Sequence, residues 1–207
     1  MAWIDRRILS YTLLHIHHIF MEKIKTYFQA IGFSGDDLDS IVKAFEVLLV
    51  KKNDLFVEEG KVSKYLAFVD SGLFQYFVWK DGEEKTTYVS IENTWLASLM
   101  SFIGQTPSLE NVKALTDGRL YIISRSALKD LVERIPAFKN FYIGLLEWAV
   151  CGIDASRHDL IVLSGDQRYE KMLRQEPHLL QQIPLQYLAS MLGVTPRHLS
   201  RIRKNIH

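Results

Sequence analysis

Short apolar runs alternate with turn residues in the middle of the chain, between positions 45 and 124. The runs are rich in Val, Phe, Tyr and Ile, and their short, fairly regular spacing predicts an all-β roll or barrel. The Asp81-Gly82 pair predicts a type I′ hairpin turn, because that turn needs positive φ at both central positions. The expected strands cover residues 65–69, 73–79, 86–91, 111–115 and 119–123, the last two paired around Asp117-Gly118. An irregular stretch before the fourth run predicts a short helix over 96–102, ended by Gly104.

On both sides of this β region, apolar residues recur at helical spacing. Upstream they predict a helix ended by Gly32 and a second helix over 36–44 that Ser34 caps. Downstream they predict a helix over 124–134, which Pro136 breaks.

A long helix is predicted from Ala137 to about Leu163, and at ~1.5 Å per residue it would span about 40 Å. A helix of that length usually finds a partner, and a second copy of the chain is the simplest partner. Its apolar stripe follows a 3–4 spacing through Phe138, Phe141/Tyr142, Leu145, Trp148/Ala149, Gly152, Ala155/Ser156, Asp159/Leu160 and Leu163. Residues 164–166 predict a short break and therefore a hinge.

The stretch 184–204 predicts two short helices joined by a tight turn. Gly193 ends the first helix, because a residue without Cβ adopts the left-handed conformation cheaply. Thr195 and Pro196 are suited to the N-cap and the first position of the second helix. This second helix has an apolar face of Leu199 and Ile202, and four Lys or Arg residues without an acid between positions 197 and 204. That arrangement is typical of a helix-turn-helix that enters the DNA major groove, and the alternative is a helical hairpin with a solvated basic face.

Composition narrows the functional classes. The chain has 207 residues, 48% of them apolar, which allows one large domain or two modest ones with a real core. A net charge of +1 means that any DNA affinity comes from a local patch. The single Cys151 excludes an intrachain disulfide and indicates a reducing, cytoplasmic location. No apolar run reaches the ~18 residues of a membrane span.

The first 20 residues form an extra segment with two open interpretations. They are either a real N-terminal helix or an upstream extension before a true start at Met21. No small-x-small cleavage site supports a signal peptide. His15, His17 and His18 do not have the spacing of a known tetrahedral metal site, so no metal is expected there.

The order of these elements resembles the bacterial transcription regulators of the cAMP-receptor-protein/FNR family, over residues 21–204. The most specific part is Arg168-Tyr169, followed by the Pro177–Pro184 segment and the stretch 187–203. The resemblance implies an α+β fold with a β-roll of the cyclic-nucleotide-binding type (a double-stranded β-helix), a dimerisation helix and a small all-α helix-turn-helix domain. The corresponding boundaries are an extra segment over 1–20, a sensor over 21–135, a dimerisation helix over 136–164 and a DNA-binding domain over 165–207.

The resemblance also implies partners and site residues. The partners are a homodimer mate, double-stranded DNA with a two-fold-symmetric site, and RNA polymerase as a further candidate. Arg197 and Arg201 are the candidates for base readout, because arginine forks onto guanine. His198 either assists them or lies along the backbone, while Arg203 is as well explained as a solvated charge. Thr195, Ser200 and Lys204 are expected phosphate contacts.

Two departures from the family bear on the effector and on DNA binding. Where cAMP-binding members carry Gly-Glu-Leu, this chain has Ala97-Ser98-Leu99, and no cation stands at Ser108-Leu109 where they carry Arg-Ser. A buried phosphate without its Arg loses a strong ion pair, so cAMP is not the expected effector, and no cofactor is expected. The chain stops at His207, so the usual wing has no residues to form it. The expected effector pocket comprises Trp95, Ser98, Leu99, Phe102 and Ser108, or these side chains fill it themselves.

Two other functional classes compete with the regulator. An enzyme with a cupin-like barrel would need clustered metal ligands, yet residues 45–124 contain no His, and no nucleophile–base pair is evident, so catalysis is not expected. A ligand-sensing or scaffold protein with a degenerate helix-turn-helix is the remaining alternative. The near-neutral charge favours it, and the intact basic face of the second helix argues against it.

Overall fold

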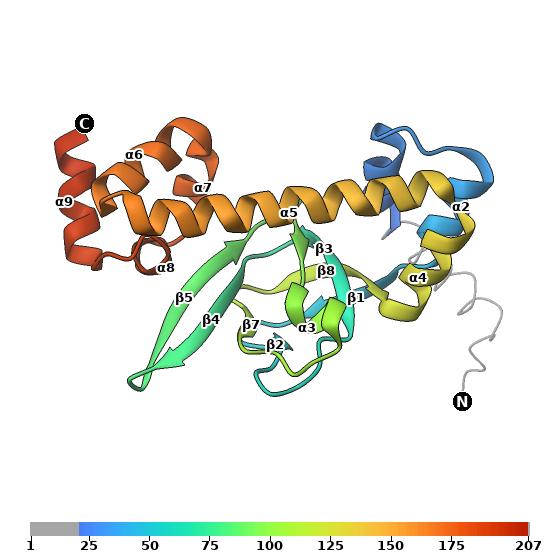
Figure 1. Ribbon diagram of the computed structural model, residues 1–207, viewed down its shortest axis with the longest axis horizontal. Helices are drawn as coiled ribbons and strands as arrows, with labels where there is room; N and C mark the ends of the chain where they lie inside the picture. Colours follow the sequence, from blue (N-terminus) through green and yellow to red (C-terminus); the bar gives the residue numbers. More distant parts are fainter. Residues whose placement is uncertain (1–20, 207) are drawn as a thin grey trace, which may run out of the picture.

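The computed structural model describes residues 21–206, and these form a β-roll, a long helix and a compact helical unit at the C-terminal end (Figure 1). Residues 21–30 are helical and are followed by α2 (Gly35–Lys43). The histidine cluster at 15–18 and both interpretations of the first 20 residues lie outside the described part. Within it, no helix is long and apolar enough to cross a membrane.

The β-roll that the sequence predicted is present, and it consists of two four-stranded antiparallel sheets. One sheet has the order β1-β8-β3-β6 and the other β2-β7-β4-β5. The predicted turn at Asp81-Gly82 is confirmed, because φ is 54° at Asp81 and 77° at Gly82. The strands are β1 (Glu46–Val50), β2 (Leu55–Val57), β3 (Tyr65–Ser71), β4 (Phe74–Lys80), β5 (Glu83–Ser90), β6 (Trp95–Leu96), β7 (Asn111–Ala114) and β8 (Gly118–Ser124).

Two apolar cores flank the first sheet, because its strands alternate their side chains between two faces. Val69, Phe74 and Leu120 belong to the core inside the roll. Phe68 and Tyr121, from the same strands β3 and β8, belong to a second core with helix 21–30, α4 and the start of α5. The helices at this end therefore form one unit with the β-roll. We call residues 21–135 the sensor unit, after the role predicted for them from the sequence.

The predicted pairing of residues 111–115 with 119–123 is wrong. β7 pairs with β2 and β4, whereas β8 pairs with β1 and β3 in the other sheet. The connection between them does not form a hairpin, because it is bonded to the start of β4 instead. Leu115 N donates to Leu73 O at 2.8 Å, and Leu73 N donates to Thr116 Oγ1 at 3.1 Å.

The short helix of the irregular stretch starts later than predicted, as α3 (Leu99–Gly104). Trp95 and Leu96 form β6 instead, because they pair with Phe68 and Ala67 of β3. Gln105, with φ of 53°, provides the left-handed end that was expected at Gly104.

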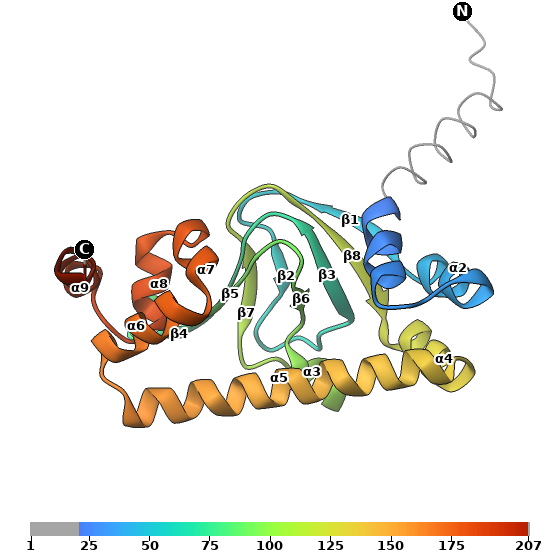
Figure 2. The same ribbon diagram turned by 90° about the horizontal axis from the view of Figure 1, so that it is seen from above.

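The long helix is α5 (Pro136–Val162), which follows α4 (Arg125–Arg134) and runs past the whole roll to the C-terminal unit (Figure 2). The break predicted at 164–166 lies slightly earlier, at Leu163 and Ser164, because α6 (Gly165–Gln175) already begins at Gly165. The hinge itself stays a prediction. Ser164 and Gln167 form a capping box, and only Leu163 separates the box from α5. A Cβ at Gly165 would lie 2.2 Å from Val194 Cγ1, so Gly165 permits close packing rather than bending.

The C-terminal unit comprises α6, α7 (Pro177–Gln182), α8 (Leu185–Met191) and α9 (Pro196–Ile206). Its core contains Leu188, Leu199 and Ile202, as the apolar spacing predicted. Val89 of β5 and Ile91, which follows that strand, complete this core. The unit is therefore packed against β5 rather than hanging from α5 alone.

Candidate nucleic-acid interface

Helices α8 and α9 have the geometry that a helix-turn-helix needs. Gly193 has φ of 65°, and Val194 N donates to Ala189 O at 2.9 Å, so the turn folds back on α8. Thr195 caps α9, because its Oγ1 accepts from His198 N at 3.1 Å. Leu199 and Ile202 are buried against α8, and this leaves the opposite face of α9 free for a partner.

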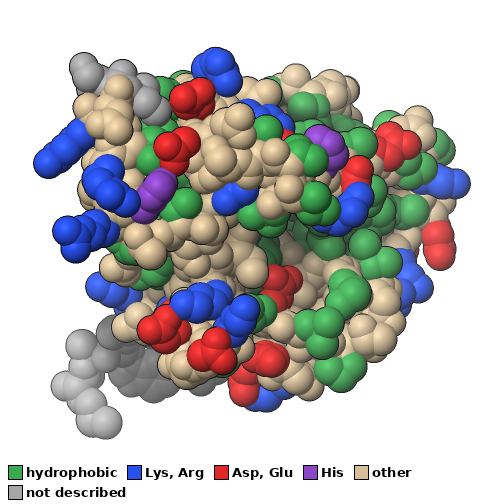
Figure 3. Space-filling model, turned by 60° about the vertical axis from the view of Figure 1, so that its left-hand side comes forward, with side chains coloured by type: hydrophobic (Ala, Val, Ile, Leu, Met, Phe, Trp, Pro, Cys, Tyr) green, Lys and Arg blue, Asp and Glu red, His purple; other side chains and the backbone are tan. Residues whose placement is uncertain are grey.

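Four of the six predicted DNA-contacting residues are exposed along that face: Thr195, Arg197, Arg201 and Lys204. Arg197 and Arg201 lie one helical turn apart on α9. Figure 3 shows Lys and Arg side chains gathered at the edge of the molecule formed by its C-terminal end. This local surface can attract phosphates, although the net charge of the chain is only +1.

The other two predicted residues, His198 and Ser200, are only partly exposed, and their side chains bond to other groups of the chain. His198 Nε2 lies 2.7 Å from Asp166 Oδ1, so the ring is turned toward α6. The Ser200 hydroxyl donates to Pro196 O at 3.0 Å, so its proton is not directed outward to a phosphate. Arg203 was expected to be as well explained as a solvated charge, but it is half-buried, donates to Leu180 O at 3.3 Å and lies over the Tyr169 ring.

Arg168 has a structural role that the residue types alone did not reveal. Its guanidinium donates to Leu192 O at 2.6 and 3.0 Å and also to Leu163 O. These carbonyls lie at the end of α8 and the end of α5. Arg168 therefore fixes the helix-turn-helix to the last residue of the long helix.

We expect Arg168→Ala to lower the free energy of unfolding by about 2–3 kcal/mol, because two carbonyl oxygens lose a charged donor. Urea unfolding followed by circular dichroism measures this change. Arg174→Ala is the matched control on the exposed side of α6 and should stay within about 0.5 kcal/mol of the wild type. An Arg168→Ala protein as stable as the control would contradict the assigned role.

The C-terminal unit is also hydrogen-bonded to strand β5 of the β-roll. Ser190 Oγ of α8 accepts from Thr86 N at 2.9 Å and lies 3.2 Å from Thr86 O in β5. Because Val89 and Ile91 belong to the core of the same unit, the contact is both polar and apolar. The orientation of α9 is thus set by contacts with β5 as well as with α5.

The long helix leaves a row of apolar side chains without a partner among the described residues. Ile143, Val150, Ile153 and Leu160 are 43, 63, 60 and 53% exposed. With Leu146 they recur at spacings of three, four, three and seven residues, which is a heptad-like pattern. We call these five residues the α5 stripe. The stripe predicted from the sequence shares Leu160 with it but otherwise differs, since Phe138, Phe141 and Leu145 pack against the core of their own chain.

The residues predicted to form an effector pocket lie in two different surroundings. Ser98 and Ser108 are buried, and their hydroxyl oxygens lie 3.0 Å apart. Trp95, Leu99 and Phe102 instead pack on the core that the N-terminal helix shares with the sheet.

The space beside the two serines is occupied by groups of the chain itself. The Tyr76 hydroxyl accepts from Ala97 N at 3.0 Å and lies 3.3 Å from Ala97 O. Burial raises the pKa of Tyr76, so its hydroxyl stays neutral. The Glu110 side chain lies close to Ser98, and burial raises the pKa of this carboxyl, while the Ser98 hydrogen bond opposes the rise.

Comparisons with known proteins agree with this geometry. Residues 47–135 match the cyclic nucleotide-binding domain family. FixK2 of Bradyrhizobium japonicum superposes with a TM-score of 0.65 at 14% identity, covering 79% of this chain and 84% of that one. Residues 47–135 are therefore similar to cyclic nucleotide-binding domains, and about four fifths of the chain has the fold of the Crp/Fnr regulators.

Two further solved structures show the same arrangement. The catabolite activator protein of Thermus thermophilus has a TM-score of 0.54 at 20% identity, with 84% of each chain covered. A transcriptional regulator of the Crp/Fnr family from Eubacterium rectale has a TM-score of 0.60 at 19% identity, covering 84% of this chain and 83% of that one. No curated protein sequence matches the chain. The α+β fold with a β-roll and a long helix, expected from the sequence, is confirmed.

A phosphate bound beside Ser98 and Ser108 would be stabilised by a nearby cation, whereas the side chain that adjoins Ser98 is the acidic Glu110. The Ser108 hydroxyl is 2.7 Å from Glu110 O, and the Glu110 carboxylate adjoins Ser98. An anion placed beside the two serines would therefore be repelled by this carboxylate.

We expect Glu110→Gln to raise the urea midpoint at pH 7. Burial raises the pKa of this carboxyl in the folded chain, so its contribution to stability is fully present below the unfolded pKa and is lost as the pH rises through the folded value. The amide removes that loss, and the gain should disappear at pH 4. Glu83→Gln is the control, because the exposed Glu83 has its pKa lowered by Lys85 and should give no gain. An unchanged midpoint for Glu110→Gln at pH 7 would count against this account.

Metal chemistry finds no support within residues 21–206. No three His, Cys, Asp or Glu side chains of that range are grouped so that they could hold a metal ion. Cys151 is an exposed residue on α5.

Proposed function

We propose that this chain is a homodimeric transcription regulator that binds two-fold-symmetric DNA through α9. The observation that carries the proposal is the exposed basic face of α9, held by an apolar face docked on α8. Arg197 and Arg201 read base edges, while Thr195 and Lys204 hold phosphates. His198 and Ser200 can contact DNA only if their side chains give up the hydrogen bonds to Asp166 and Pro196.

The α5 stripe supports the dimer. Exposed apolar residues at heptad-like spacing are stabilised when two helices pair, and a two-fold pair of α5 helices places two α9 helices on one duplex. The expected site is therefore an inverted repeat with half-site centres about one helical turn, ~34 Å, apart.

The sensor is proposed to respond to an effector other than cAMP. Tyr76 satisfies the backbone of Ala97, and the Ser98–Ser108 pair with Glu110 presents hydroxyls and a carboxylate to any incoming phosphate. Adding cAMP should therefore leave DNA affinity unchanged.

Salt dependence of DNA binding tests the proposal against a scaffold protein with a degenerate helix-turn-helix. If a dimer neutralises ~8 phosphates, log K for duplex DNA should fall against log salt with a slope near −7. Fluorescence anisotropy of a labelled duplex, from about 50 to 300 mM KCl, measures the slope. Lack of affinity at the lowest salt, or a flat response, would favour the scaffold.

A further inference from the structure

We propose that an aromatic groove between α5 and the sensor, away from the Ser98–Ser108 pair, binds a small, neutral, planar apolar ligand. This deepens the proposed regulator by naming the chemical class of its effector. The groove has a volume of about 520 Å³, within the usual size of a ligand site. It is lined by Tyr27 of helix 21–30, by Asn93, Thr94 and Trp95 at the entrance to β6, and by Asn140, Phe141, Gly144, Leu145 and Trp148 of α5.

One wall of the groove is a packed aromatic cluster. The rings of Tyr27 and Trp95 lie 5.9 Å apart, and Phe141 lies 5.8 Å from Trp95 and 6.4 Å from Tyr27. Trp148, 66% exposed, makes no ring contact with a described residue and borders the same groove. A planar ring entering the groove would gain stacking on Trp148 and edge contacts with the cluster.

The polar groups of the groove suit a neutral molecule. Among the described residues, no Lys, Arg, Asp, Glu or His lines it, so an ionised ligand would lose hydration without gaining a counter-charge from them. The exposed amides of Asn93 and Asn140 each supply donors and an acceptor. The Tyr27 hydroxyl accepts from Trp95 Nε1 at 3.1 Å, which leaves its own proton for a ligand.

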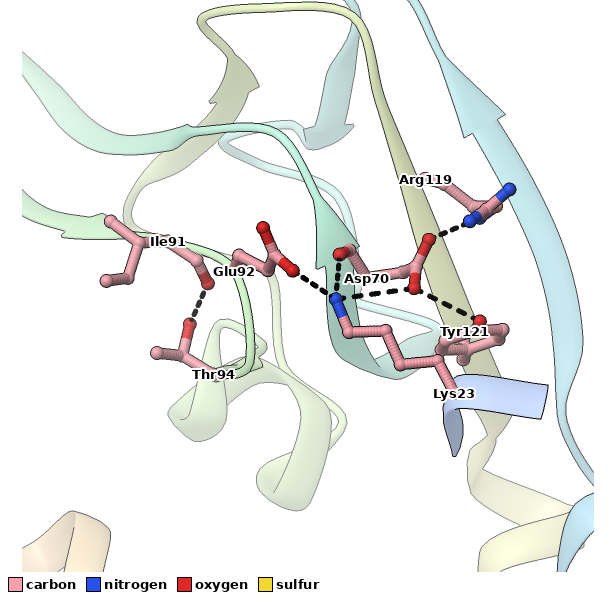
Figure 4. Close-up of polar contacts among 7 residues, drawn as sticks. All are labelled: Lys23, Asp70, Ile91, Glu92, Thr94, Arg119 and Tyr121. Carbon is pink, nitrogen blue, oxygen red and sulfur yellow. Dashed lines mark hydrogen bonds and ion pairs between the residues drawn. The ribbon is translucent and has the colours of Figure 1, made fainter. Parts of the chain in front are cut away.

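Ion pairs hold the wall in place before any ligand arrives. Lys23, one turn before Tyr27, pairs with Glu92 and donates to Asp70 O at 2.5 Å (Figure 4). Asp70 is 2% exposed and also pairs with Arg119 and accepts from Tyr121 at 3.2 Å. Because Lys23 and Tyr27 lie on the same side of one helix, the contact that positions the helix also positions the groove.

A ligand here would contact the sensor and the helix that leads to the DNA-binding unit. Tyr27 and Trp95 belong to the sensor, whereas Trp148 lies on α5, which continues to Leu163 and its bond with Arg168. Binding would therefore favour one position of α5 against the roll.

A second copy pairing through the α5 stripe would not fill this groove. Successive residues of a helix are rotated by about 100° about its axis. Val150 therefore lies roughly opposite Phe141 on α5, whereas Trp148 lies on the same face as Phe141. The groove and the stripe are thus different faces of one helix.

Two glycines of α5 provide a test with a matched control. A Cβ at Gly144 or at Gly152 would meet no atom within 4 Å, so leucine fits at either position, and only Gly144 lines the groove. The probe is the neutral dye N-phenyl-1-naphthylamine, titrated by fluorescence without DNA. We expect wild type and Gly152→Leu to bind it alike, and Gly144→Leu to bind at least tenfold more weakly with an unchanged mass in light scattering.

Three results would overturn the proposal. Wild type could fail to bind the dye, or Gly144→Leu could bind as well as wild type, which would place the dye elsewhere. A change of Gly144→Leu from dimer to monomer would show that the groove is an interface between copies. Since no DNA is present, none of these results bears on whether α9 binds DNA.

Discussion

Replacing both Arg197 and Arg201 by alanine should reduce affinity for the selected DNA site by at least about a thousandfold. Each bidentate arginine–guanine contact contributes roughly 1–3 kcal/mol, and a dimer has two copies of each side chain. Both residues are exposed on α9, so the stability of the fold should stay within about 0.5 kcal/mol of the wild type. Fluorescence anisotropy with the selected duplex gives the affinity, and urea unfolding gives the stability.

The control removes two positive charges from another exposed surface. Lys129→Ala/Arg134→Ala on α4 has the same change of net charge and should alter affinity by less than about threefold, because both residues lie at the sensor end of the chain. If the α9 variant binds no worse than the α4 variant, α9 is not the reading helix.

The second large effect is expected from Val150→Asp/Ile153→Asp, which should convert the dimer to a monomer at micromolar concentration. These side chains are 63 and 60% exposed in the single chain, so each protomer should still fold. In a paired α5 interface the four carboxylates of a dimer would be buried without partners, at a cost of several kcal/mol. We expect the dimer dissociation constant to rise by at least about a thousandfold, with DNA affinity falling alongside it. Sedimentation equilibrium measures the mass.

Gly152→Asp/Ala155→Asp is its control, since the charges and their spacing are the same and the helix face is the opposite one. That variant should remain dimeric. Monomers in both variants, or dimers in both, would show that the α5 stripe is not the contact.

Local signals explain what the sequence predicted correctly. Asp81-Gly82 and Gly193 have the positive φ that their residue types favour, and such preferences act within a few residues. Leu199 and Ile202 recur at helical spacing, so the buried face of α9 could be predicted without knowledge of what it packs on.

Long-range contacts explain the strand pairing and the groove, which could not be predicted from the sequence. The partners of β7 and β8 are strands whose paired residues lie 34 or more positions away, and nothing near Asp117 specifies them. The groove joins Tyr27, Trp95 and Trp148, which come from three separate segments. The start of α6 could have been predicted, however, because Ser164-x-x-Gln167 is a capping-box spacing that signals a helix start.

The exposed basic residues of the candidate site were predicted from the sequence, but the hydrogen bonds that its side chains make within the chain were not. Arg197, Arg201 and Lys204 are outward because Leu199 and Ile202 must be inward. The bond of His198 to Asp166 depends on how α6 packs beside α9, and the three bonds of Arg168 depend on where α5 and α8 end. Those placements come from the tertiary structure and not from the spacing of residues in α9.

Selection from a pool of random duplexes with the purified wild-type chain tests the central claim most directly. After repeated capture and sequencing, we expect enrichment of an inverted repeat whose half-site centres lie about 10 base pairs, or a multiple of one helical turn, apart. Enrichment of a single unsymmetrical half-site would contradict binding as a two-fold dimer. Recovery of the starting pool without enrichment would contradict sequence reading by α9.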